Sequence, residues 1–90
     1  MKLLIHVPGA TAEELERGVA VAQAVFDAAG VTPYEAAAAY FKMTGEQEDL
    51  SEQEGRAADA WDEADVAAAQ ACCAGWEVAP GRADLELKLR

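Results

Sequence analysis

The sequence predicts a single α+β domain spanning residues 1–90 in the order β-α-α-α-β, with three helices packed on a small sheet of the two terminal strands. Three observations predict this fold. Both ends of the chain alternate apolar and polar residues, and three internal segments open with the same helix-capping pattern. A length of 90 residues is that of one domain, and a hydrophobic content of 52% favours a folded chain over a disordered one.

The two ends are predicted to be strands at residues 2–7 and 84–90. The apolar residues that alternate on one face are Leu3, Ile5 and Val7 in the first strand and Leu85, Leu87 and Leu89 in the second. Two strands alone make a marginally stable sheet, so helices must cover it or a second copy of the chain must extend it. The pattern leaves open whether the two strands pair parallel or antiparallel.

Each of the three helices is predicted to begin with a capping box, in which a Ser or Thr caps the helix and a Glu three residues later reaches back to it. The boxes begin at Thr11, Thr32 and Ser51. Three glycines follow the apolar periodic runs and predict helix ends, because glycine readily adopts the left-handed conformation found there; they are Gly30, Gly45 and Gly75. We therefore expect helices near residues 12–29, 33–44 and 52–74.

The first two helices differ in their apolar pattern. The first has an apolar stripe that includes Leu15, Val19 and Phe26, with Gly18 inside it. A glycine inside a helix costs about 1 kcal/mol relative to alanine, so we expect another helix or a strand to approach closely at Gly18. The second helix is apolar nearly all round, which predicts either the most buried helix or a partly exposed one.

The strongest charge feature is an acidic run from Glu46 to Asp65. It holds nine carboxylates and one base, Arg56, and thus a net charge of −8 out of the −10 of the whole chain. A segment this anionic repels nucleic acids and anionic membranes and attracts basic surfaces. Some of its acids, such as Glu52 and Glu54, also stabilise the positive end of the third helix.

The third helix divides into two faces when it is projected at about 100° per residue. One face carries Ala57, Trp61, Ala64, Ala68, Ala71 and Cys72, and the opposite face carries acids with Val66 beside them. The residues predicted to bind a partner are Glu46, Glu48, Asp49, Asp59, Asp62, Glu63 and Val66. The ordinary alternative is a solvated outer face with a small apolar residue on it, which is common on protein surfaces.

No catalytic, cofactor-binding or metal-binding residues are predicted, and we expect a protein that is not an enzyme and uses no cofactor. His6 is the only histidine and has no obvious partner in the sequence. Cys72 and Cys73 are adjacent and have no nearby histidine or further cysteine to complete a zinc site, so they are interpreted as small apolar residues. The acids of the third helix do not follow the spacing of a calcium loop.

Nucleic acids and membranes are not expected to be direct partners. The basic residues do not cluster with aromatic ones, and the chain has no glycine-rich phosphate-binding motif. The apolar run at the N-terminus stops at Pro8, which is too early for a signal peptide or a membrane span. These features favour a cytoplasmic location.

The sequence therefore predicts a small, acidic, non-enzymatic interaction protein. Its carboxylates would mimic the charge of a nucleic acid and occupy a basic surface of a partner, for example in a nucleic-acid-binding complex. Phage-encoded inhibitors of CRISPR effectors, which are small, acidic and single-domain, are the analogy that size and charge suggest. The alternatives are a structural or regulatory subunit that forms a homodimer through a sheet edge or the second helix, and a small enzyme or metal-binding module that uses His6 or the carboxylates.

Overall fold

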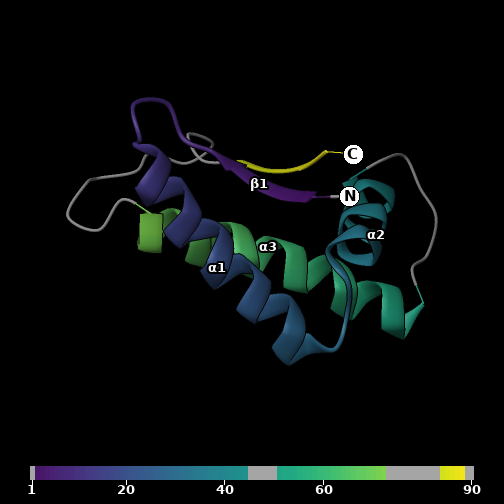
Figure 1. The fold of residues 1–90 in the computed structure, drawn as a ribbon. Helices are drawn as coiled ribbons and strands as arrows, with labels where there is room; N and C mark the ends of the chain where they lie inside the picture. The colour runs from purple at the N-terminus through teal and green to yellow at the C-terminus, as the bar shows by residue number, and fades with distance from the viewer. Residues whose placement is uncertain (1, 45–50, 73–83, 89–90) are drawn as a thin grey trace.

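A computed structural model describes residues 2–44, 51–72 and 84–88. The elements are strand β1 (Lys2–His6), helix α1 (Ala12–Ala29), helix α2 (Pro33–Thr44), helix α3 (Glu52–Cys72) and strand β2 (Asp84–Lys88), as Figure 1 shows. The element order is the predicted one, and the largely helical composition with terminal strands agrees with the α+β class. The predicted helix ends at Gly45 and Gly75 lie outside the described residues.

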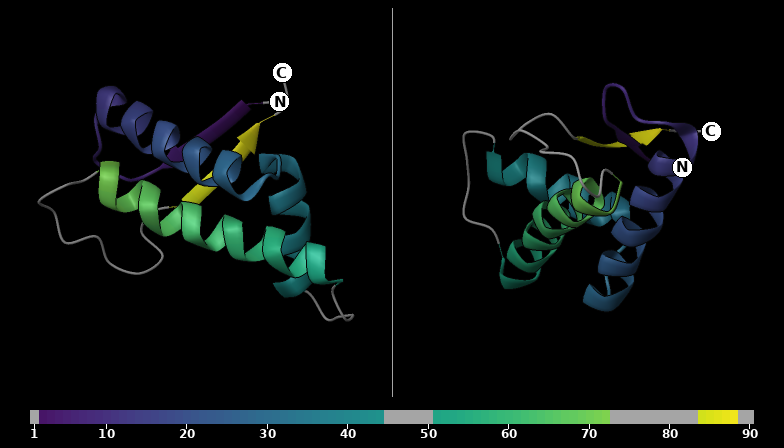
Figure 2. Two further views of the ribbon diagram at one scale, coloured as in Figure 1. Left: turned by 90° about the horizontal axis from the view of Figure 1, so that it is seen from below. Right: turned by 90° about the vertical axis from the view of Figure 1, so that its left-hand side faces the viewer.

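The strands β1 and β2 run antiparallel, a direction that the sequence left open. Lys2 lies opposite Lys88 and His6 lies opposite Asp84. The two strands lie side by side over the same face of α1 and α3 (Figure 2). The strand β1 ends one residue before the predicted end at Val7, but Leu3, Ile5 and Val7 are all buried in the main core together with residues of all three helices.

All three predicted capping boxes are present. The Thr11 Oγ1 accepts a hydrogen bond from the Glu14 N–H at 3.2 Å, and the Glu14 carboxylate accepts one from the Thr11 N–H at 2.9 Å. The boxes that begin at Thr32 and Ser51 have the same two bonds. Helix α1 ends at Gly30, whose φ of 74° is the left-handed conformation predicted for it.

Three aromatic rings from three helices meet in the core. The ring centroid of Trp61 on α3 lies 5.8 Å from that of Phe26 on α1 and 6.4 Å from that of Tyr40 on α2. Such pairs add about 0.5–1.5 kcal/mol each beyond the burial of their surface. Trp61 is therefore the residue through which α1, α2 and α3 are joined, and its predicted place in the core is confirmed.

The close approach predicted at Gly18 is also confirmed. A Cβ atom on Gly18 would lie 3.0 Å from the Ala68 backbone oxygen, 3.2 Å from the Cys72 Cβ and 3.2 Å from the Ile5 Cδ1. Helix α1 thus contacts both α3 and β1 at this residue. The absence of a side chain at Gly18 allows the helix pair and the strand to pack together.

Arg17, the residue before this contact, stabilises the end of α3. Its Nε donates to the Ala71 carbonyl at 3.1 Å, and its Nη2 donates to the Cys72 carbonyl at 3.3 Å. These are carbonyls of the last helical turn, where a cation also interacts favourably with the helix dipole. Arg17 thereby holds α1 and α3 together across 54 residues of sequence.

Helix α2 follows the second of its two predicted alternatives and is partly exposed. Ala36, Ala37 and Ala39 are buried, whereas Tyr34 is 60% exposed and Phe41 is 70% exposed.

None of the described helices combines the length and the apolar character needed to cross a membrane.

Candidate functional site

The predicted acidic residues of α3 share one exposed face of that helix. Asp59, Asp62 and Glu63 are all exposed, and Glu52 precedes them by two turns on the same side. At a rise of about 1.5 Å per residue, the carboxylates from Glu52 to Glu63 extend over about 16 Å of the helix axis. We call these four residues the acidic face of α3.

Arg56 also lies on this side of α3 and is exposed. It stands one turn after Glu52 and three residues before Asp59, so it offsets one of the four negative charges. The structure describes three basic side chains, and the other two, Arg17 and Lys42, are held by contacts within the fold. Among the residues that the structure describes, Arg56 is thus the basic side chain that can offset negative charge on the acidic face.

Of the other residues predicted to bind a partner, one is placed by the structure. Val66 is 53% exposed and follows Glu63 by three residues, so it extends the acidic face by one turn. The loop acids Glu46, Glu48 and Asp49 lie outside the described residues.

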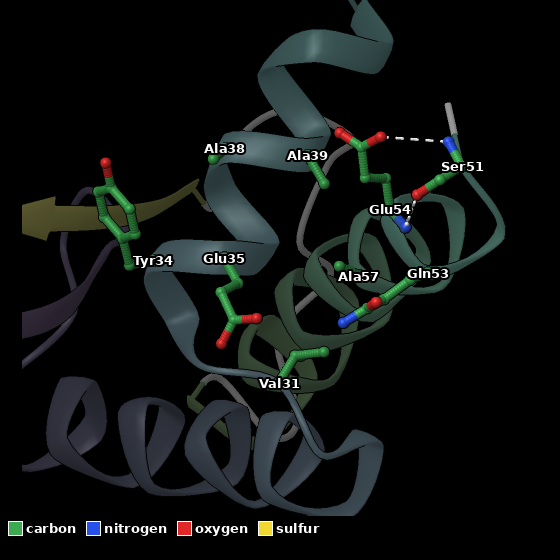
Figure 3. A pocket seen from close by; sticks show the side chains of 9 residues that line it. All are labelled: Val31, Tyr34, Glu35, Ala38, Ala39, Ser51, Gln53, Glu54 and Ala57. Atoms are coloured by element: carbon green, nitrogen blue, oxygen red, sulfur yellow. Dashed lines mark hydrogen bonds between the residues drawn. The ribbon is translucent and has the colours of Figure 1, made fainter. Parts of the chain in front are cut away.

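A groove between α2 and the start of α3 is the second feature of this region (Figure 3). Its volume is about 270 Å³, and it is open to solvent on one side. The lining residues are Val31, Tyr34, Glu35, Ala38, Ala39, Ser51, Gln53, Glu54 and Ala57. We call it the α2–α3 groove. Gln53 lies about 100° around α3 from Glu52, so the groove begins at the margin of the acidic face.

An ion pair fixes one wall of the α2–α3 groove. The Lys42 Nζ, in the last turn of α2, lies 3.0 Å from the Glu54 Oε2, in the first turn of α3. The other carboxylate oxygen of Glu54 accepts a hydrogen bond from the Ser51 N–H at 3.1 Å. The bond from the Ser51 backbone and the bond from Lys42 both favour the ionised carboxylate, so they hold the pKa of Glu54 below its ordinary value of 4.5.

This lowered pKa predicts a loss of stability in acid. Above pH 4.5 the Glu54 carboxylate is ionised in both the folded and the unfolded chain, and its stabilising contacts are fully present. As the pH falls below 4.5, the unfolded chain takes up the proton first, so the contribution is lost as the pH passes through the lowered pKa.

The check is urea unfolding of the wild type and of Glu54→Gln between pH 7 and pH 3. A glutamine still caps Ser51 but does not titrate, so we expect the wild type to be more stable at neutral pH and the difference to shrink in acid. A difference that stays constant over this pH range would contradict the prediction.

The residues considered for chemistry are not brought together. His6 is exposed at the end of β1, and Cys72 is buried in the main core. Within the described parts of the chain, no three side chains of the histidine, cysteine, aspartate and glutamate types are grouped so as to hold a metal ion.

Comparison of the chain with protein-family models, with curated proteins and with solved structures finds no match.

The α2–α3 groove was missed by reasoning from the sequence. From the sequence, Glu35 and Glu54 are predicted only as the glutamates of capping boxes at helix starts. Helix periodicity places residues on a face of their own helix, but it does not say which face of a neighbouring helix lies opposite. The groove depends on which face of α2 lies opposite the start of α3.

Proposed function

We propose that this protein is a non-enzymatic interaction protein whose acidic α3 face occupies a basic surface of another protein. The observation that carries the proposal is the grouping of Glu52, Asp59, Asp62 and Glu63 on one exposed helix face with Arg56 as the described counter-charge. Opposite charges steer two surfaces together and set the register in which they meet, whereas like charges exclude other partners.

The specific form of the proposal is mimicry of a nucleic acid. Four carboxylates over about 16 Å give a mean spacing of about 5 Å, which is of the same order as the phosphate spacing of about 3.4 Å along one DNA strand. Arginines and lysines that hold phosphates would then bind the acidic face. A nucleic-acid-binding complex is the expected partner, and inhibition of a CRISPR effector by a phage-encoded protein is the example that the size and the charge of the chain favour.

The test is competition with target DNA for RNA-guided nuclease complexes. The wild type is expected to displace the DNA, and its affinity should fall by about tenfold or more between 50 and 200 mM salt because exposed charges are screened. Asp59→Asn, Asp62→Asn and Glu63→Gln combined should weaken binding by about tenfold to a hundredfold.

A matched control separates position from net charge. The combination of Glu13→Gln, Glu16→Gln and Asp27→Asn removes the same three charges from exposed residues of α1. We expect it to retain most of the affinity. If the α3 combination binds every complex tested as tightly as the wild type does, the proposed function is wrong.

One observation favours a second candidate, a subunit that forms a homodimer through α2. Tyr34, Ala38 and Phe41 are exposed and follow one another at helical spacing. The net charge of −10 opposes the association of identical copies. Light scattering distinguishes the candidates, because a homodimer would lose its doubled mass on replacement of α2 residues and not of α3 acids.

A further inference from the structure

The size of the α2–α3 groove indicates what it holds. Its volume of about 270 Å³ lies just below the range of about 300–1,000 Å³ that is typical of small-molecule sites. A groove of this size suits one or two side chains. Its apolar lining includes Ala39 and Ala57, which form a small buried cluster with Ala58, and Val31, which packs against both this cluster and the main core.

Two carboxylates, those of Glu35 and Glu54, line the α2–α3 groove, and they differ in the partners that they already have. The Glu35 Oε1 accepts the capping bonds from the Thr32 N–H at 3.3 Å and from the Thr32 hydroxyl at 2.9 Å. Glu54 also accepts two hydrogen bonds, from the Ser51 N–H and from Lys42, but its charge is already met by the Lys42 ammonium at 3.0 Å. A carboxylate accepts about four hydrogen bonds, so Glu35 can bind a further donor in the groove.

The lining residues around Glu35 fit a long cationic side chain. In Figure 3 the side chains of Glu35 and Gln53 point toward each other from the two helices, with Val31 and Ala57 between them. The alkyl part of such a side chain would pack on the alanines and the valine, while its charged end meets the carboxylate. An arginine fits best, because its planar guanidinium binds carboxylates through paired hydrogen bonds.

We propose that the α2–α3 groove holds an arginine side chain of the partner whose basic surface meets the acidic face of α3. This inference rests on the proposed function, and it names the residue type that the partner contributes. Two observations favour a basic partner over a second copy of the chain: the free acceptor capacity of Glu35 and the net charge of −10. Gln53 lines the groove and lies about 100° around α3 from Glu52, so a basic segment that crosses the first turn of α3 can contact both the groove and the margin of the acidic face.

The experiment uses a hexa-arginine peptide and a hexa-lysine peptide, titrated into the full chain and followed by NMR. We expect tighter binding of hexa-arginine, with shifts at Glu35, Gln53 and Ala57. Glu35→Gln should weaken the binding of hexa-arginine by about threefold to tenfold. Because glutamine preserves a capping box, this variant is expected to fold.

Two control variants match the changes made in the α2–α3 groove. Glu14→Gln makes the same substitution at the same place in the capping box of α1, outside the groove. Ala38→Leu fills the groove without changing its charge, and Ala24→Leu adds the same side chain at an exposed residue of α1. We expect Ala38→Leu to weaken the binding of hexa-arginine, and we expect the two α1 variants to bind like the wild type.

The possible outcomes separate this inference from the proposed function. If Glu35→Gln and Ala38→Leu bind hexa-arginine like the wild type while the α3 combination loses binding, the groove proposal is overturned and the proposed function stands. Equal affinity for the two peptides, an effect of Ala38→Leu without one of Glu35→Gln, or a dimer that Ala38→Leu dissociates would also overturn it. If the combination of Asp59→Asn, Asp62→Asn and Glu63→Gln also binds hexa-arginine like the wild type, the proposed function fails.

Discussion

Replacement of Gly18 by leucine is expected to destabilise the protein by about 3 kcal/mol, because a side chain in a filled contact forces its neighbours apart. The first atom of that side chain would already lie 3.0 Å from the Ala68 backbone oxygen. The oxygen belongs to the hydrogen-bonded backbone of α3 and cannot rotate away as a side chain can. The Ile5 Cδ1 and the Cys72 Cβ limit movement in the other directions.

Gly55 provides the matched control for Gly18. It also lies in a helix, but a Cβ atom on Gly55 would meet nothing within 4 Å. Gly55→Ala should therefore stabilise the protein by about 0.5–1 kcal/mol through the higher helix propensity of alanine. Urea unfolding followed by circular dichroism measures both variants. Equal stability of Gly18→Leu and the wild type would show that α1 and α3 do not pack as the structure describes.

Replacement of Trp61 by alanine is expected to remove about 3–5 kcal/mol of stability, as is usual for a buried aromatic residue. The loss would include the ring contacts with Phe26 and Tyr40, which join the three helices. A domain of this length has only about 0.05–0.15 kcal/mol of stability per residue. We therefore expect the variant to be largely unfolded or to unfold at a much lower urea concentration.

Two further variants test whether the effect of Trp61 comes from its position in the core. Trp61→Phe keeps a ring between Phe26 and Tyr40 and should lose less stability than Trp61→Ala. Phe41→Ala removes an aromatic side chain that is 70% exposed, so its effect should be within about 1 kcal/mol. If Phe41→Ala cost as much as Trp61→Ala, the assignment of Trp61 to the centre of the core would be wrong.

The elements could be predicted from the sequence because the signals for them are local. Thr11, Thr32 and Ser51 mark helix starts through bonds that close within three residues, so neither the rest of the chain nor its packing is needed to recognise them. Gly30 marks a helix end for the same reason. The acidic face of α3 was also predictable, because the helical repeat alone places Asp59, Asp62 and Glu63 on the side opposite Trp61.

Other contacts could not be predicted because they join residues that are distant in the sequence. Glu13 stands four residues before Arg17, which suggests an ion pair within α1, yet the Arg17 guanidinium donates to the carbonyls of Ala71 and Cys72. Lys42 and Glu54 are separated by the end of one helix and the start of the next. No local pattern indicates which of these partners a long charged side chain will reach.

The sequence by itself determined the order of the elements, the starts of the helices and the concentration of negative charge on α3, since each depends on spacing along one segment. Only the tertiary structure decided the antiparallel pairing of β1 with β2, the residues of α3 and β1 that contact Gly18, and the α2–α3 groove. The physical reason is that these features arise where two packed elements meet. Their relative placement follows from the burial of apolar surface over the whole core, which no single segment encodes.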